Sequence, residues 1–305
     1  MADREGLLNI LFVGLIVAIL GGFGWWYWSY ETGSGIVRDS APSWEPGSRQ
    51  VIFSSEANGK SDICIVDLTG RERRVLIQTP SNESHPTYTL DGSAIAFDTD
   101  RDGNYEIYRM RANGEAQQRL TNHAAEDRAP SWSPDGRTIV FMSNRDTPDF
   151  DVYRMDADGK NVQRLLTGGT AKYPQFAPDG AHIAMQIARD IHVLSLKTGQ
   201  LRRLTHEPAN GMYPTWSSDA SQIAFMSWRN GRTELFTAKA SGLEPQMLVT
   251  MPTGDAVDPR WSPDGERIAF VHLPDGVAAE VRSADQQRII YIVDVKTRRL
   301  TRLSR

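Results

Sequence analysis

The chain has 305 residues, of which 40% are hydrophobic and 24% are charged, a balance typical of a globular protein and unlike a disordered one. Its net charge is −4, and its basic residues are scattered, which argues against a nucleic-acid-binding surface. Cys64 is the only cysteine, which excludes an internal disulfide and a zinc site built from several thiolates.

The first element in the chain is an apolar segment. After a short tail (residues 1–6), residues 7–28 carry no charge and are long enough to cross a bilayer as a helix. The segment ends in Trp25, Trp26, Tyr27 and Trp28, side chains that settle at the membrane interface. A cleaved signal peptide is the alternative, but its basic start and its small-residue cleavage site are missing. We therefore expect an uncleaved transmembrane helix.

Small residues recur on one face of this predicted helix. Gly14, Ala18 and Gly22 are spaced by four residues, so a second helix could approach closely there, although small residues are also common in membrane helices generally. Residues 29–39 form a short Gly/Ser-containing linker, which should keep the following domain close to the membrane.

The rest of the chain repeats one pattern six times. In each repeat, a proline is followed two residues later by an aromatic side chain. The prolines are Pro42, Pro86, Pro130, Pro174, Pro214 and Pro259, and successive prolines are 44, 44, 44, 40 and 45 residues apart. Each is followed by a turn, often Asp-Gly, then by an apolar triplet and two further strand-like runs of rising polarity.

Four short strands in each unit of this length are typical of a propeller blade. A solenoid has a similar period, but it needs distinct capping repeats, and the first and last units resemble the middle ones. The predicted fold is all-β: a six-bladed β-propeller of four-stranded blades over residues 40–305, preceded by one transmembrane α-helix. The predicted blades are residues 40–83, 84–127, 128–171, 172–211, 212–256 and 257–305.

The repeats resemble those of the TolB family, also called WD-like β-propeller repeats, and the likeness is clearest at residues 130–141 and 259–270. The resemblance implies a periplasmic propeller that binds a protein at its mouth. This chain departs from the family because the predicted anchor stands where TolB-type proteins have an N-terminal α/β domain, so the resemblance does not imply a role in the Tol–Pal system.

A binding site is predicted where the chain passes from the rim of one blade to the centre of the next, because these segments should ring one mouth of the central channel. Both signs of charge and two tyrosines are present, as suits a polar protein interface. The candidate residues are Arg38, Asp39, Glu83, His85, Asp127, Arg128, Lys172, Tyr173, Met212, Tyr213, Asp255 and Asp258.

Catalytic and cofactor motifs were sought in the same sequence. There is no Gly-x-Ser-x-Gly elbow, and the histidines lack metal-ligand spacing, so we expect no catalytic residue, no metal, no cofactor and no enzymatic activity. The predicted function is a protein-binding scaffold or accessory subunit of a larger bacterial inner-membrane complex, such as a respiratory or photosynthetic one, with the propeller in the periplasm and other membrane subunits and lipid as partners. A sensor of small ligands or glycans, and a hydrolase acting at the channel mouth, are the alternatives.

Overall fold

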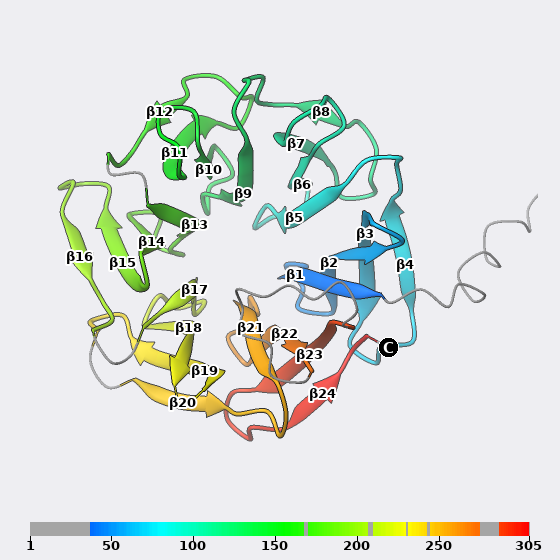
Figure 1. Cartoon of the computed structure of the whole chain (residues 1–305), viewed down its shortest axis with the longest axis vertical. Coiled ribbons are helices and arrows are strands. Elements are labelled where there is room, and N and C mark those ends of the chain that lie inside the picture. The colour runs from blue at the N-terminus through cyan, green and yellow to red at the C-terminus, as the bar shows by residue number, and fades with distance from the viewer. Residues whose placement is uncertain are drawn as a thin grey trace, which may run out of the picture. The chain divides into compact units, whose positions relative to one another are not determined.

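A ring of six β-sheets makes up the part of the chain that the computed structural model describes, namely residues 37–167, 170–206, 210–229, 231–242, 245–274 and 287–304. Each sheet is antiparallel and contains four consecutive strands, and the sheets surround a common centre (Figure 1). The predicted six-bladed propeller of four-stranded blades is therefore confirmed. Because every blade supplies its own four strands, the ring closes without a strand exchanged between the two ends of the propeller.

Each blade runs from an inner strand at the channel to an outer strand at the rim (Figure 1). The inner strands are β1 (Arg38–Trp44), β5 (Glu83–Tyr88), β9 (Asp127–Trp132), β13 (Ala171–Phe176), β17 (Met212–Trp216) and β21 (Asp255–Trp261). The second strands are β2 (Gln50–Ala57), β6 (Ala94–Thr99), β10 (Thr138–Ser143), β14 (His182–Ile187), β18 (Gln222–Arg229) and β22 (Arg267–Leu273). The third strands are β3 (Lys60–Asp67), β7 (Glu106–Arg111), β11 (Asp151–Asp156), β15 (Asp190–Ser195), β19 (Arg232–Lys239) and β23 (Ile289–Asp294). The outer strands are β4 (Arg73–Ile77), β8 (Gln118–Arg119), β12 (Gln163–Arg164), β16 (Leu201–Arg203), β20 (Gln246–Val249) and β24 (Leu300–Arg302).

The repeated proline marks a β-bulge in every inner strand. In β1 the pairing with β2 shifts between Ser40 and Ser43, so that two residues of β1 oppose one residue of β2, and the other five blades shift at the same place. Proline lacks an N–H group and is tolerated in a sheet at an edge strand or a bulge. The inner strand is such an edge, and its proline also blocks the channel-facing side from pairing with another strand.

The apolar core lies between neighbouring blades. The triplets of the second strands supply its largest fully buried side chains, including Phe53, Phe97, Phe141, Phe225 and Phe270. Each core cluster contains residues of two neighbouring blades, so no blade buries its apolar faces alone.

The ring closes between the sixth and first blades. Trp44 and Phe53 of the first blade pack with Ile290 and Leu303 of the sixth, and the Trp44 indole N–H donates to the Arg260 carbonyl oxygen at 2.9 Å. The first blade also begins slightly earlier than predicted, because Arg38 and Asp39 already belong to β1.

The predicted transmembrane helix (residues 7–28) lies outside the described residues. Among the residues that the structure does describe, none forms a helix with the length and hydropathy needed to cross a bilayer.

We predict that Asp127→Ala destabilises the propeller strongly. Asp127 is fully buried and forms an ion pair of 2.7 Å with Arg145, whose side chain is 15% exposed. Removing one partner of a buried pair leaves the other charge without compensation, which costs about 3 kcal/mol. Urea unfolding measures the loss. The control is Asp158→Ala, which removes an exposed ion pair with Lys160 and should change the midpoint little. Equal effects of the two substitutions would refute the prediction.

Candidate functional site

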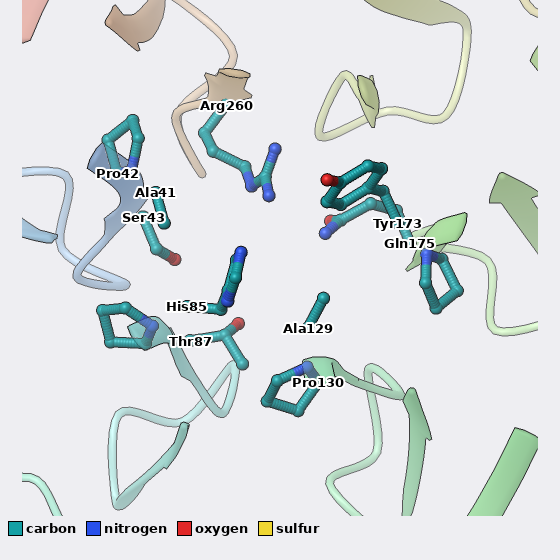
Figure 2. Close-up of a pocket in the computed structure, with 12 residues that line it drawn as sticks. Ala41, Pro42, Ser43, His85, Thr87, Ala129, Pro130, Tyr173, Gln175 and Arg260 are labelled. Atoms are coloured by element: carbon teal, nitrogen blue, oxygen red, sulfur yellow. The ribbon is translucent and has the colours of Figure 1, made fainter. Parts of the chain in front are cut away.

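A small pocket lies at the centre of the ring, lined by side chains of the inner strands (Figure 2). Its volume is about 40 Å³, room for a few water molecules. We call it the channel pocket, and its lining residues are Ala41, Pro42, Ser43, His85, Pro86, Thr87, Ala129, Pro130, Tyr173, Pro174, Gln175 and Arg260.

The bulge determines which side chains reach this pocket. The residue before each repeat proline has a left-handed backbone, with φ between 49° and 53° in all six blades. A residue before proline normally stays extended, and a non-glycine residue in the left-handed region carries a strain of about 1–3 kcal/mol. A bulge re-aims side chains, and here the residues before and after the proline both face the centre. The six residues of the pre-proline position are Ala41, His85, Ala129, Tyr173, Tyr213 and Asp258.

The residue directly after each repeat proline, the post-proline position, supplies polar side chains, and several of them have no hydrogen-bond partner among the described residues. In the third and fifth blades the hydroxyls of Ser131 and Thr215 accept backbone N–H groups from the next blade. In the other blades this position holds Ser43, Thr87, Gln175 and Arg260, which point toward one another across the pocket in Figure 2. Within the described part of the chain, the side chains of Ser43, Thr87 and Gln175 form no hydrogen bond.

Arg260 is held in place on one side. Its Nη1 lies 2.9 Å from Oδ1 of Asp258 and donates to the Pro259 carbonyl oxygen at 2.9 Å. The other N–H groups of the guanidinium form no hydrogen bond with the described residues. Arg260 therefore offers donors to the pocket in a fixed orientation.

His85 is the titratable group at the pocket wall. Its Nδ1 donates to Oδ2 of Asp98 at 2.8 Å, and the same oxygen accepts the Ala129 N–H at 2.8 Å. Asp98 is fully buried on β6, while the His85 side chain is 23% exposed. An ionised carboxylate only accepts, so this bond fixes the proton on Nδ1 and leaves Nε2 for the pocket.

Asp98 is special to the second blade. The residues at the same register position of the other second strands, opposite the residue two before the proline, are Ser54, Met142, Gln186, Met226 and Val271. The remaining carboxylate oxygen of Asp98 is buried and has no hydrogen-bond partner among the described residues. None of the other five blades has a carboxylate here, and three of them have an apolar side chain, so the place of Asp98 beside His85 points to a role at the pocket.

An aromatic pair covers the opposite wall. The rings of Tyr173 and Tyr213 stack with centroids 4.1 Å apart, and the Tyr213 hydroxyl donates to the Tyr173 hydroxyl at 3.0 Å. Because that oxygen is already an acceptor, the Tyr173 proton remains available to the pocket.

Four of the predicted mouth residues are instead buried in bonds within the blades. Asp39 pairs with Arg73, Glu83 with Arg101, and Asp127 with Arg145, while Asp255 accepts the Thr233 N–H at 2.6 Å. Burial raises the pKa of Glu83 and of Asp127, and the neighbouring hydroxyls and guanidinium groups oppose that rise. These carboxylates anchor the starts of inner strands and are not available to a partner.

The other predicted residues divide into two groups. His85, Tyr173, Tyr213 and Asp258 occupy the pre-proline position at the channel. Arg38, Arg128, Lys172 and Met212 lie at the starts of the inner strands, all of them partly exposed. We call the side of the propeller where the inner strands start the entry face. The binding role of these eight residues stays a prediction.

Sequence reasoning missed Asp98 and the post-proline residues Ser43, Thr87, Gln175 and Arg260. Comparison of the six repeats singles out Asp98, Gln175 and Arg260, which differ from their counterparts in every other blade, whereas Ser43 and Thr87 have identical counterparts in Ser131 and Thr215. The predicted helix-packing residues (Gly14, Ala18, Gly22) and interfacial belt (Trp25, Trp26, Tyr27, Trp28) lie outside the described residues. Within the described ranges, no group of three or more His, Cys, Asp or Glu side chains is placed to hold a metal ion.

Comparison with known proteins identifies the family. The TolB beta propeller domain matches residues 33–185 and 168–289. The chain belongs to this family. A putative TolB from Agrobacterium tumefaciens is similar in structure, with a TM-score of 0.72 and 20% identity over 84% of this chain and 88% of that one.

Enzymes are also among the similar proteins. The uncharacterized peptidase YuxL of Bacillus subtilis is 33% identical over 135 residues, 40% of this chain and 20% of YuxL. An oligogalacturonate lyase from Vibrio parahaemolyticus has a TM-score of 0.60 and 13% identity over 89% of this chain and 79% of the lyase. The matched segment spans less than a third of the curated relatives that it resembles.

The expectation that the chain has no enzymatic activity is contradicted by these relatives. It rested on the missing catalytic and metal-binding motifs. The lyase shows that an enzyme can consist largely of this fold, because a propeller gathers side chains from distant blades into one channel. Missing local motifs therefore exclude nothing here.

We predict that Asp98→Ala destabilises the second and third blades. The substitution removes the partner of His85 and of the buried Ala129 N–H, which should cost about 2 kcal/mol. Ser54→Ala is the matched control, since Ser54 occupies the same position in the first blade and its buried hydroxyl has no hydrogen-bond partner among the described residues. It should change stability by less than about 0.5 kcal/mol. Both are measured by urea unfolding, and a loss for Ser54→Ala as large as for Asp98→Ala would count against the assignment.

Proposed function

We propose that this TolB-type propeller binds a segment of another protein at the entry-face mouth of its channel. The observation that carries the proposal is the channel pocket, where polar side chains from several blades converge with open hydrogen-bonding capacity. TolB-type propellers are protein-interaction domains, which supports a protein as the partner. The same binding step serves a structural partner or a substrate, so the proposal is compatible with the enzymatic relatives.

The mouth itself has the character of a polar interface. Lys172 pairs with Asp149 at 2.7 Å, and Arg128 pairs with Glu126 at 2.9 Å while its guanidinium lies 3.4 Å from the centre of the Tyr105 ring. These contacts hold long side chains in place, which lowers the entropy lost when a partner binds. Charges of both signs next to aromatic rings are typical of protein interfaces.

The predicted membrane anchor extends the proposal to a location. Residues 7–28 would hold the chain in the bacterial inner membrane with the propeller on the periplasmic side, and the helix face of Gly14, Ala18 and Gly22 would pack against another membrane subunit. The apolar sequence and the resemblance to periplasmic TolB-type proteins support this arrangement. We propose that the partner belongs to a larger inner-membrane complex, such as a respiratory or photosynthetic one.

We predict that a photo-crosslinking amino acid at position 172 captures a partner protein in cells, because Lys172 lies at the entry face and is partly exposed. Position 137 is the control: Arg137 is exposed in the turn that joins β9 to β10, at the opposite end of the inner strand. The readout is the adducts resolved by gel and identified by mass spectrometry. Adducts at both positions, or at position 137 alone, would contradict the proposed binding face.

We predict that alkaline phosphatase fused to the C-terminus is active. This enzyme needs disulfides, which form in the periplasm and not in the cytosol. A fusion lacking residues 7–28 is the control and should be inactive. Mass spectrometry of the active fusion should find residues 1–28 still attached, as expected of an anchor. Inactivity of the full fusion would refute the location, and removal of the segment would show a signal peptide instead.

A further inference from the structure

The channel pocket offers several hydrogen-bond donors, among which the guanidinium of Arg260 is the charged one. Arg260 contributes N–H groups, Gln175 an amide, and Ser43, Thr87 and Tyr173 hydroxyls, and all of them face the centre (Figure 2). The one carboxylate on the inner strands beside these groups, Asp258, is already paired with Arg260. Hydroxyl and amide groups can also accept, but the guanidinium of Arg260 only donates, so a ligand that satisfies it must bring acceptors of its own.

The pocket volume limits the size of that ligand. About 40 Å³ holds a few water molecules. A carboxylate has only three heavy atoms and suits so small a pocket. A carboxylate also suits a fixed guanidinium, since the two groups share a planar geometry.

We infer that the channel pocket binds a carboxylate, supplied by an acidic side chain of the bound protein segment, and that His85 makes this binding proton-dependent. The inference rests on the proposed function and names the chemistry that the pocket recognises.

His85 gives the pocket its dependence on pH. When the imidazole is neutral, Nδ1–H donates to Asp98, and Nε2 faces the pocket as an acceptor that repels a carboxylate. When it is protonated, Nε2–H becomes a charged donor, and the negative charge of Asp98 stabilises the imidazolium. Histidine is the side chain that changes charge between about pH 5 and 8.

The other charged or titratable groups that face His85 are its bonded partner Asp98 on β6, the ion pair of Arg260 and Asp258 on β21, and the Tyr173 phenol on β13. A ligand carboxylate stays ionised down to about pH 5. Binding should therefore strengthen as the pH falls from about 8 to 5.5, because protonation of His85 adds one charge-assisted hydrogen bond.

The test uses the full-length chain in mild detergent and two fluorescent tripeptide amides, Gly-Glu-Gly and its isostere Gly-Gln-Gly, with fluorescence anisotropy as the readout. We expect the glutamate probe to bind at least about tenfold more tightly at pH 5.5, because the protonated imidazole and the carboxylate form a charge-assisted hydrogen bond. The preference should shrink at about pH 8, where histidine is neutral.

Two variants separate His85 from a general effect of pH. His85→Gln should abolish the pH dependence of the preference. His182→Gln is the matched control, since His182 forms a similar pair with Asp179 at 2.7 Å in a turn that does not line the channel pocket, and it should keep the dependence. Arg260→Gln should lower the preference at every pH.

Equal binding of the two probes, or a pH dependence that survives His85→Gln, would overturn the inference. So would stronger competition by free galacturonate than by the glutamate probe, since a glycan would then be the ligand. The probes report on the pocket without any partner protein, whereas the crosslinking experiment reports on the partner without regard to its charge. Failure of the carboxylate site and failure of the proposed function are therefore distinguishable.

Discussion

Burial of both faces of each sheet against neighbouring blades is the constraint on which the whole structure depends. A four-stranded sheet with apolar side chains on both faces cannot stand alone in water. Here every core cluster is shared between two blades, and the cluster of Trp44, Phe53, Ile290 and Leu303 joins the last blade to the first. Only a closed ring leaves no blade with an uncovered apolar face, so the channel follows from the closure of the ring.

The same constraint explains why buried charges are tolerated at the entry face. The inner strands converge at the centre, and the side chains of Asp39, Glu83 and Asp127 near their starts are fully buried. One arginine pairs with each of the buried carboxylates of Asp39, Glu83 and Asp127. Each of these arginines also lies over a phenylalanine ring in the second strand of the same blade, in the pairs Arg73–Phe53, Arg101–Phe97 and Arg145–Phe141. The ion pair fixes the start of the strand, and the bulge that follows then aims the pre-proline side chain at the channel.

The fold could be predicted from the sequence because the sequence pattern of one blade occurs six times. Six prolines at nearly constant spacing, each followed by an aromatic residue, a turn and an apolar triplet, specify the same four strands six times. The site was harder to predict from the sequence, because the residue before each proline has a left-handed backbone, which a residue in that position normally avoids. The bulge was not predicted, so acids near the mouth such as Glu83 and Asp127 were expected to be exposed.

The enzymatic expectation failed for a related physical reason. Its premise was that chemistry needs a local motif or a separate domain, but a ring brings together residues that are far apart in the chain, as Ser43, His85, Gln175 and Arg260 are here. A regular repeat alone would give six equivalent walls and no specific ligand. Chemical identity arises where blades differ at equivalent positions, and in this channel the largest differences are His85 with Asp98 in the second blade, the stacked tyrosines of the fourth and fifth, and Arg260 in the sixth. The function of a TolB-type propeller is therefore to be sought in the departures from its repeat, while the repeat itself accounts for its stability.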